Sequence, residues 1–243
     1  MDVSSSQFTE DGWLPGWGVF ETLRTVNGIA YSFSRHMERA LLGCRTLSVP
    51  IPEYFVVREA ITDLISLDSF SDGVLRISFG SDGQWGAVHM PYRPVETPAK
   101  VRIHPVNIAS ASGVIKSYPY THRLEILNQA KSIGFDEALV CNSDGNIAEG
   151  AVTNLLLQLD GRWLTPPIED GVLPGIMRDL VLENLEVDIE SIPLSKVEDI
   201  TSALLLSSLR FCQPVASING RALQSSGPLS AQIHALAALH SID

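Results

Sequence analysis

The stretch over residues 137–165 constrains the fold more than any other part of the chain. Its short apolar runs, EALVC, NIAEGAVTNLLLQL and RWLT, are separated by turn signals, SDG at 143–145 and DG at 160–161. Apolar runs of about four to eight residues bounded by Gly, Asp and Ser are typical of buried β-strands. The stretch therefore predicts successive strands of one sheet.

Helical patterns alternate with further strand patterns elsewhere in the chain. Residues 121–134 place Leu124, Leu127 and Ala130 at helical spacing, with Thr121 as the expected cap and Gly134 as the expected end. Other helices are expected over 35–47 after a cap at Ser34, over 53–67, over 173–185, at a capping box over 195–198, and over 227–240. Strands are expected over 18–26 and 29–34 around an Asn27-Gly28 turn, over 73–80, near 100–106 and over 202–208. This mixture predicts an α/β (α+β) fold.

A change of composition over residues 91–113 predicts a boundary between two lobes. Proline-rich PYRPVETP is followed by an extended KVRIHPV and by small, polar NIASASG. We expect a small N-terminal lobe over residues 1–107, an interdomain loop over 108–113 and a larger lobe over 114–243. A chain of 243 residues has room for two such units.

Composition excludes several classes of function. The net charge of −11 argues against a nucleic-acid partner, which requires clustered Lys and Arg. No apolar run reaches the roughly 18 residues of a membrane span, and the acidic N-terminus lacks the pattern of a secretory signal, so we expect a cytoplasmic protein without a membrane partner. Cys44, Cys141 and Cys212 are too scattered to indicate a disulfide framework or a zinc site. Motifs of P-loop, dinucleotide, zinc-hydrolase and serine-hydrolase sites are missing from the sequence.

Lys116 is one of only four lysines, and its position is unusual. It follows the apolar pair Val114-Ile115 and precedes a run of hydroxyl and aromatic residues. Most lone lysines lie on the surface. A partly buried lysine, by contrast, loses basicity and can form a Schiff base with a carbonyl group. Both interpretations stay open on the lysine alone.

Several later residues allow a similar choice between a structural and a chemical role. Glu149 is either an edge carboxylate or the partner of a protonated ring nitrogen, and Asn154 is either a satisfied core amide or a residue that orients it. The segment GVLPGIMRD over 171–179 is either an ordinary helix start or a phosphate-binding one. Ser207-Ser208 and Arg39 are candidates for further contacts to the same anion.

The motifs occur in an order that resembles the class IV aminotransferase family, the fold type IV pyridoxal-phosphate enzymes. They are GVFETLRT, HMERA, IKS with AKSIGFDEAL, GNIAEGAVTNLLL, LTPP, LPGIMRD and SSLRFCQPVASING, spread over about residues 16–220. The family includes branched-chain and D-amino acid aminotransferases and aminodeoxychorismate lyases. The resemblance implies two lobes, pyridoxal 5′-phosphate as cofactor, a small-molecule amino substrate and a homodimer.

The resemblance also implies roles for individual residues. Lys116 would be the Schiff-base lysine and proton shuttle, and Glu149 would pair with the pyridine nitrogen. Tyr120 joins the expected cofactor-binding set because it precedes Thr121, which stands where many aminotransferases carry a tyrosine. The residues expected to hold the phosphate are Arg39, Ser208 and the backbone at Ile176 and Met177.

The expected reaction is that of a 4-amino-4-deoxychorismate lyase, which releases pyruvate and leaves an aromatic amine. The alternative is an aminotransferase that uses a D-amino or branched-chain amino acid with a 2-oxoacid. A non-catalytic relative is the third hypothesis. Phe79 and Gln84 stand where arginines that bind the substrate carboxylate are expected, and the candidate replacements are Arg24, Arg93 and Arg102.

Overall fold

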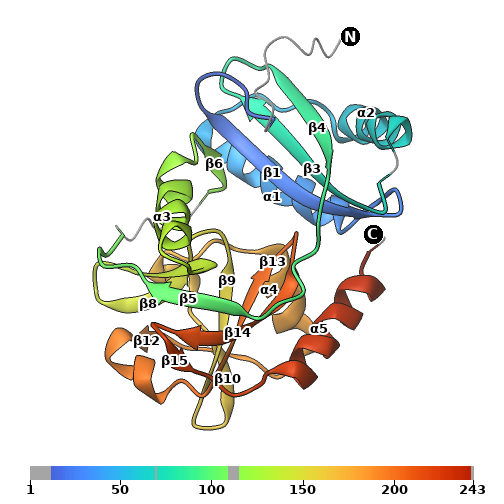
Figure 1. The fold of residues 1–243 in the computed structure, drawn as a ribbon. Coiled ribbons are helices and arrows are strands. Elements are labelled where there is room, and N and C mark those ends of the chain that lie inside the picture. Colours follow the sequence, from blue (N-terminus) through green and yellow to red (C-terminus); the bar gives the residue numbers. More distant parts are fainter. Residues whose placement is uncertain (1–11, 69, 109–114, 242–243) are drawn as a thin grey trace. The chain divides into compact units, whose positions relative to one another are not determined.

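Figure 1 shows a computed structural model of the chain, which describes residues 12–68, 70–108 and 115–241. The chain forms two compact units. The first holds the described residues up to Pro94, the segment Ile115–Tyr120 and the end of the chain from Leu239. The second holds the described residues from Val95 to Ile108 and the segment Thr121–Ala238. The mixture of helices and sheets confirms the predicted fold class.

The first unit is a sheet with two helices on one face. The strand order is β2 (Ile29–Ala30), β1 (Gly18–Val26), β3 (Asp72–Gly80) and β4 (Trp85–Pro91), and β6 (Ser117–Tyr118) also pairs with β1. The helices are α1 (Phe33–Leu47) and α2 (Tyr54–Leu67). Alternate residues of the strands, such as Val19, Leu23 and Leu75, share a buried core with Met37 and Ile61 of the helices. The other strand residues therefore project from the opposite face of the sheet.

The second unit is built on a ten-stranded sheet. The order is β11 (Asp188–Ile189), β10 (Arg162–Thr165), β9 (Asn154–Leu159), β13 (Ser202–Ser207), β14 (Phe211–Ile218), β5 (Ala99–Ile103), β7 (Glu137–Cys141), β8 (Asn146–Gly150) and β12 (Ile192–Pro193), with β15 (Arg221–Ala222) beside β14. The helices are α3 (Thr121–Ser132), α4 (Ile176–Asn184), α5 (Gly227–Leu239) and the 3₁₀ turns η1 (Ile168–Asp170) and η2 (Leu194–Asp199). The core of this unit is formed by buried Leu, Ile and Val side chains of the central strands, as their continuous apolar runs predict.

Most predicted elements are present, but two predicted helix caps are wrong. The hairpin turn forms at Asn27-Gly28, where both residues have positive φ, 48° and 80°. Helix α1 begins at Phe33 instead of after Ser34, whose hydroxyl is hydrogen-bonded to the Tyr54 hydroxyl. The expected capping box over 195–198 lies inside η2, which begins at Leu194 and has no side-chain cap.

The compact units differ from the expected lobes at two places. The first unit ends at Pro94, before the expected limit of 107, because β5 pairs with β7 and β14 of the second unit. The segment Ile115–Tyr120 belongs to the first unit because its strand β6 pairs with β1. Residues 109–113 of the expected interdomain loop lie outside the described residues.

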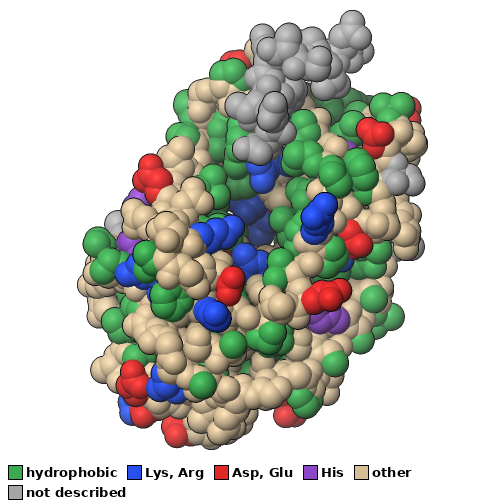
Figure 2. Space-filling model, viewed as in Figure 1, with side chains coloured by type: hydrophobic (Ala, Val, Ile, Leu, Met, Phe, Trp, Pro, Cys, Tyr) green, Lys and Arg blue, Asp and Glu red, His purple; other side chains and the backbone are tan. Residues whose placement is uncertain are grey.

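The surface has no single acidic patch on the face drawn in Figure 2, where the Asp and Glu side chains are scattered. Within the described ranges, no helix is both long and apolar enough to cross a membrane.

Candidate active site

Lys116 is half-buried and lies against aromatic rings of the first unit. Its carbonyl oxygen accepts a hydrogen bond from the Phe20 N–H at 2.9 Å, which fixes the lysine beside β1. The Nζ lies 4.6 Å from the centroid of the Phe20 ring and 5.4 Å from that of Tyr120. Aromatic faces attract an ammonium group and keep water from part of its surface. The predicted amine and the predicted Tyr120 are thus brought together.

The rings around Lys116 belong to a larger aromatic cluster. Trp13 meets Phe20 edge-on at 4.7 Å between ring centroids, and Tyr120 meets it at 5.1 Å. Burial raises the pKa of Tyr118 to about 12, so its hydroxyl stays protonated. That hydroxyl is buried and has no hydrogen-bond partner among the described residues. The cluster gives Lys116 a flat, largely apolar surround.

Arg76 of β3 lies on the same face of the first unit's sheet as Phe20, and it was not predicted from the sequence as a site residue. Arg76 lies opposite Thr22 across the β1–β3 pair, and Thr22 follows Phe20 by two residues, so the three side chains share a face. The guanidinium carbon lies 4.4 Å from the centroid of Trp13. The alternation of the strand could have indicated its position, because Leu75 and Ile77 on either side of Arg76 are fully buried on the other face of the sheet.

The arginines proposed earlier as carboxylate-binding replacements are placed differently. Arg24 forms an ion pair with Asp72 and lies over the Tyr92 ring at 5.2 Å. Arg93 is exposed, and Arg102 lies in β5 of the second unit. Arg24 is therefore held by neighbouring side chains of the first unit.

Glu21 organises the face of the sheet that carries α1. It is fully buried and accepts hydrogen bonds from His36 Nδ1 at 2.7 Å and from Arg39 Nε and Nη2 at 2.8 and 2.7 Å. Burial opposes the charge of Glu21, but Arg39 and His36 outweigh it and hold its pKa well below the usual range. Burial lowers the pKa of His36, and the neighbouring Glu21 carboxylate acts in the opposite direction. Arg39, the expected phosphate ligand, is thus held in one orientation by Glu21.

Glu149 is the centre of a hydrogen-bonded group in the second unit. It is buried at the end of β8, where its Oε2 accepts bonds from the Leu173 N–H at 3.0 Å and from Asn154 Nδ2 at 3.2 Å. Asn154 Nδ2 also donates to the Leu173 carbonyl at 2.9 Å. The Glu149 Oε1 accepts a bond from Arg123 Nη2 at 2.7 Å. Asn154 is therefore a residue that orients Glu149, the second of its two expected roles.

The start of α4 lies directly after this group. Ile176 and Met177 are its first residues, and amides of a first helical turn are free to bind an anion. A Cβ atom on the preceding Gly175 would lie 1.8 Å from Asn154 Oδ1. Glycine is therefore required if the helix is to begin so close to Asn154. The chain of contacts joins Glu149 to the predicted phosphate-binding amides within one unit.

Ser208 lies just after β13, half-buried. The neighbouring Ser207 hydroxyl accepts a bond from the Arg210 N–H at 3.2 Å. Lys116, Tyr120 and Arg39 belong to the first unit, whereas the other predicted site residues belong to the second. That second set consists of Glu149, Ile176, Met177 and Ser208.

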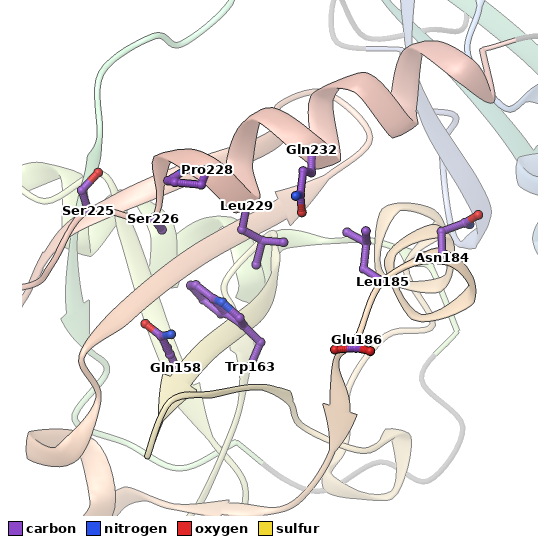
Figure 3. A pocket seen from close by; sticks show the side chains of 10 residues that line it. All are labelled: Gln158, Trp163, Asn184, Leu185, Glu186, Ser225, Ser226, Pro228, Leu229 and Gln232. Carbon is purple, nitrogen blue, oxygen red and sulfur yellow. The ribbon is translucent and has the colours of Figure 1, made fainter.

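A pocket of about 590 Å³ in the second unit lies apart from these residues. Figure 3 shows it between the first turns of α5 and strand β10, with the Trp163 ring directed toward Leu229. Its lining includes one charged side chain, Glu186, and none of the predicted site residues. Across the described ranges, no cluster of His, Cys, Asp or Glu side chains is suited to hold a metal ion.

Each unit, taken by itself, offers groups whose chemistry fits one part of the same kind of molecule. Lys116 offers an amine that reacts with an aldehyde, Glu149 offers a carboxyl group to a basic ring nitrogen, and α4 offers amides to a phosphate. The guanidinium of Arg39, fixed by Glu21, is a group of the kind that binds phosphate. The chemistry of this donor set suits a phosphorylated pyridine aldehyde.

The chain is similar to a known family and to several known proteins. The profile of the family described as amino-transferase class IV matches residues 18–218. The aminodeoxychorismate lyase of Bacillus subtilis is 28% identical over 202 residues, covering 72% of this chain and 67% of that protein. The D-alanine aminotransferase of Bacillus licheniformis is 23% identical over 239 residues, covering 89% of this chain and 84% of that protein. The branched-chain aminotransferase of Thermoproteus uzoniensis has the same fold, with a TM-score of 0.82 at 22% identity over 92% of this chain and 85% of that one.

Proposed function

Because the chain belongs to the class IV aminotransferase family, whose enzymes use pyridoxal 5′-phosphate, we propose that it is a 4-amino-4-deoxychorismate lyase. The observation that carries the proposal is the aromatic surface beside the Lys116 amine, formed by Phe20 and Tyr120. Aromatic side chains such as these can stack on a ring-shaped substrate. The similarity to the lyase of Bacillus subtilis supports the same reaction.

We assign the cofactor contacts as follows. Lys116 would hold the aldehyde carbon through its amine, and Glu149 would hold the ring nitrogen. The amides of Ile176 and Met177, with Arg39 and Ser208, would hold the phosphate, and Tyr120 packs beside the lysine. When bound, the cofactor supplies an electron sink for a carbanion.

The protein's own groups perform the remaining steps. Once the substrate amine has replaced it at the aldehyde carbon, Lys116 Nζ would be free to take the proton from the carbon that bears that amine, while Glu149 would keep a negative charge against the ring nitrogen. The C–O bond to the enolpyruvyl group then breaks, the ring becomes aromatic, and the released enolate regains a proton to give pyruvate. Phe20 and Tyr120 limit the access of water to the amine.

Arg76 is the residue that we propose for the substrate carboxylate. It projects from the same sheet face as Phe20, and a guanidinium matches a carboxylate with two parallel hydrogen bonds. Arg76→Gln should raise KM by about tenfold or more, the cost of one lost charge-assisted contact, and leave the absorbance of the bound cofactor unchanged. An unchanged KM would exclude this role.

Pyruvate release distinguishes the lyase from its alternative. The purified enzyme, loaded with pyridoxal 5′-phosphate and given 4-amino-4-deoxychorismate without any 2-oxoacid, should produce pyruvate and an aromatic amine in equal amounts. Lys116→Ala is the matched control and should produce neither. Turnover that strictly requires an amino acceptor would contradict the lyase.

An aminotransferase is the second candidate, favoured by the similarity of nearly the whole chain to the D-alanine aminotransferase. It predicts that D-alanine or a branched-chain amino acid is converted to its 2-oxoacid only when a second 2-oxoacid is present. We further propose a homodimer, for which light scattering should give a mass near twice that of the 26.4 kDa chain. A mass equal to one chain would contradict it.

A further inference from the structure

Arg123 is turned inward at the start of helix α3. Leu127 and Ala130, four and seven residues later, are buried on the same helical face, whereas His122 and Leu124 beside it are exposed. Only 14% of the Arg123 side chain is exposed. The pattern of the helix therefore carries a guanidinium toward the interior of the second unit.

This position is electrostatically unfavourable for a helix. The first turn carries the positive end of the helix dipole, and α3 has no acidic residue there to compensate. A cation at this end costs about 0.3–1 kcal/mol. Because the cation does not stabilise the helix itself, we infer that an interaction outside the helix favours arginine at this position.

The partner of Arg123 outside the helix is Glu149. Arg123 Nη2 lies 2.7 Å from Glu149 Oε1, and both side chains are largely withdrawn from solvent. The other guanidinium nitrogen, Nη1, is buried without a hydrogen-bond partner among the described residues. An unsatisfied cationic donor is costly, and an acceptor on a bound molecule would satisfy it. Arg123 therefore contacts Glu149 directly and keeps a buried donor that an acceptor on a bound molecule would satisfy.

We propose that Arg123 is a positioning residue that keeps Glu149 ionised and aimed at the cofactor's ring nitrogen. The inference rests on the proposed role of Glu149. The neutral groups that donate to Glu149 include the Asn154 amide and the Leu173 N–H, whereas Arg123 brings a cation into direct contact with its Oε1. Burial without a cation favours the protonated form, which cannot accept a bond from a protonated ring nitrogen in the same way.

Arg178 of α4 is a second cation that acts on Glu149. Burial lowers the pKa of Arg178, and Glu149 is among the carboxylates that act in the opposite direction. Its guanidinium donates to Thr165 Oγ1 at 3.3 Å and to the Pro166 carbonyl at 3.0 Å. Arg178 therefore contributes a field at a distance, while Arg123 makes the contact.

The test is the affinity of the cofactor-free protein for pyridoxal 5′-phosphate, measured between about pH 8 and about pH 5.5. This range includes the raised pKa that is typical of a buried carboxyl group without a cationic partner. Arg123→Met should lose affinity progressively as the pH falls, by about tenfold or more relative to wild type at the acid end, because protonated Glu149 no longer pairs with the ring nitrogen. Arg123→Lys should restore most of the wild-type profile. Lys131→Met removes an exposed cation from the same helix and should leave the profile unchanged.

A second readout needs no cofactor. In Arg123→Met the buried carboxyl takes up its proton more readily in the folded state than in the unfolded state, so the variant is destabilised most at high pH. Its deficit in melting temperature relative to wild type should therefore narrow as the pH falls. A purely packing defect would give a deficit independent of pH.

The outcomes separate the two proposals. If wild type binds the cofactor but Arg123→Met keeps a wild-type pH profile, or loses affinity equally at every pH, the role of Arg123 is overturned. If Glu149→Gln binds the cofactor as wild type does, the assignment of Glu149 itself fails. In a Glu149→Gln background, Arg123→Met should cause no further pH-dependent loss, and an additional pH-dependent loss would contradict the proposal.

Discussion

Glu21 shows how a single residue can fix another, Arg39, for which we propose a phosphate contact. Its carboxylate is fully buried on β1 and is hydrogen-bonded by both His36 and Arg39 of α1. The ion pair holds the guanidinium in place before any phosphate arrives, which reduces the entropy lost on binding. Glu21 acts on the ligand only through Arg39.

Glu21→Gln should lower the free energy of unfolding by about 3 kcal/mol near neutral pH, because it leaves a buried cation without its partner. The pKa of Glu21 is depressed in the folded state, so its stabilisation is present above the ordinary carboxyl pKa and is lost as the pH falls toward the depressed value. Urea unfolding of wild type and variant should therefore differ most at about pH 7 and less below about pH 4.

Glu59→Gln is the control, because Glu59 is exposed on α2 and its loss should change the free energy of unfolding by less than about 0.5 kcal/mol. A Glu21→Gln variant as stable as this control at neutral pH would contradict the importance of the buried pair.

Some candidate site residues could be predicted from the sequence and others could not. Lys116 and Glu149 belong to ordered motifs, and their candidate roles follow from resemblance. Arg76 and Arg123 were missed because their roles depend on which face of an element they occupy and on a distant partner. Glu149 is 26 residues from Arg123, and no local pattern joins the two.

At the scale of elements, the entry into α4 links a strand end to a helix start. Asn154 at the start of β9 donates to Glu149 and to the Leu173 carbonyl, and Gly175 leaves room for its amide. The carboxyl group and the helix amides therefore move together if this junction is disturbed.

Gly175→Ala should displace Asn154, because the added Cβ would lie 1.8 Å from its Oδ1. We expect cofactor affinity to fall by about tenfold or more, as hydrogen bonds to Glu149 are lost or lengthened. Fluorescence titration with pyridoxal 5′-phosphate measures the change. Gly227→Ala, at the start of α5, is the matched control, since its added Cβ meets only Ser225 Oγ at 3.5 Å. Equal affinities in the two variants would contradict the role of this junction.

Elements with a clear apolar pattern bounded by turns were predictable from the sequence, whereas an element that contains a residue unfavourable to its structure was not. Strands β7, β9 and β13 are buried runs bounded by turns, as expected. Strand β14 was not predicted as a strand, and it contains Pro214, which lacks the N–H of a regular ladder. The cap predicted at Ser34 is wrong because a local pattern does not include the bond from that hydroxyl to Tyr54, which lies 20 residues away.

At the scale of the whole molecule, the sequence predicted two parts but not how the chain is shared between them. Strand β5 pairs in parallel with β7 and β14, which follow it far along the sequence. Such pairings depend on register across the sheet, which local patterns do not specify. The return of Ile115–Tyr120 to the first unit has the same origin, since two residues of β6 pair with β1.

Covalent attachment of the cofactor to Lys116 is tested most directly by borohydride reduction of the protein loaded with pyridoxal 5′-phosphate, followed by peptide mass spectrometry. The wild type should lose its visible absorbance band and carry one phosphopyridoxyl group, on Lys116. Lys116→Ala should carry none, whereas Lys131→Ala, which changes an exposed lysine, should be labelled on Lys116 as in wild type. A reducible band that persists in Lys116→Ala, or a label found on another lysine of the wild type, would contradict the assignment.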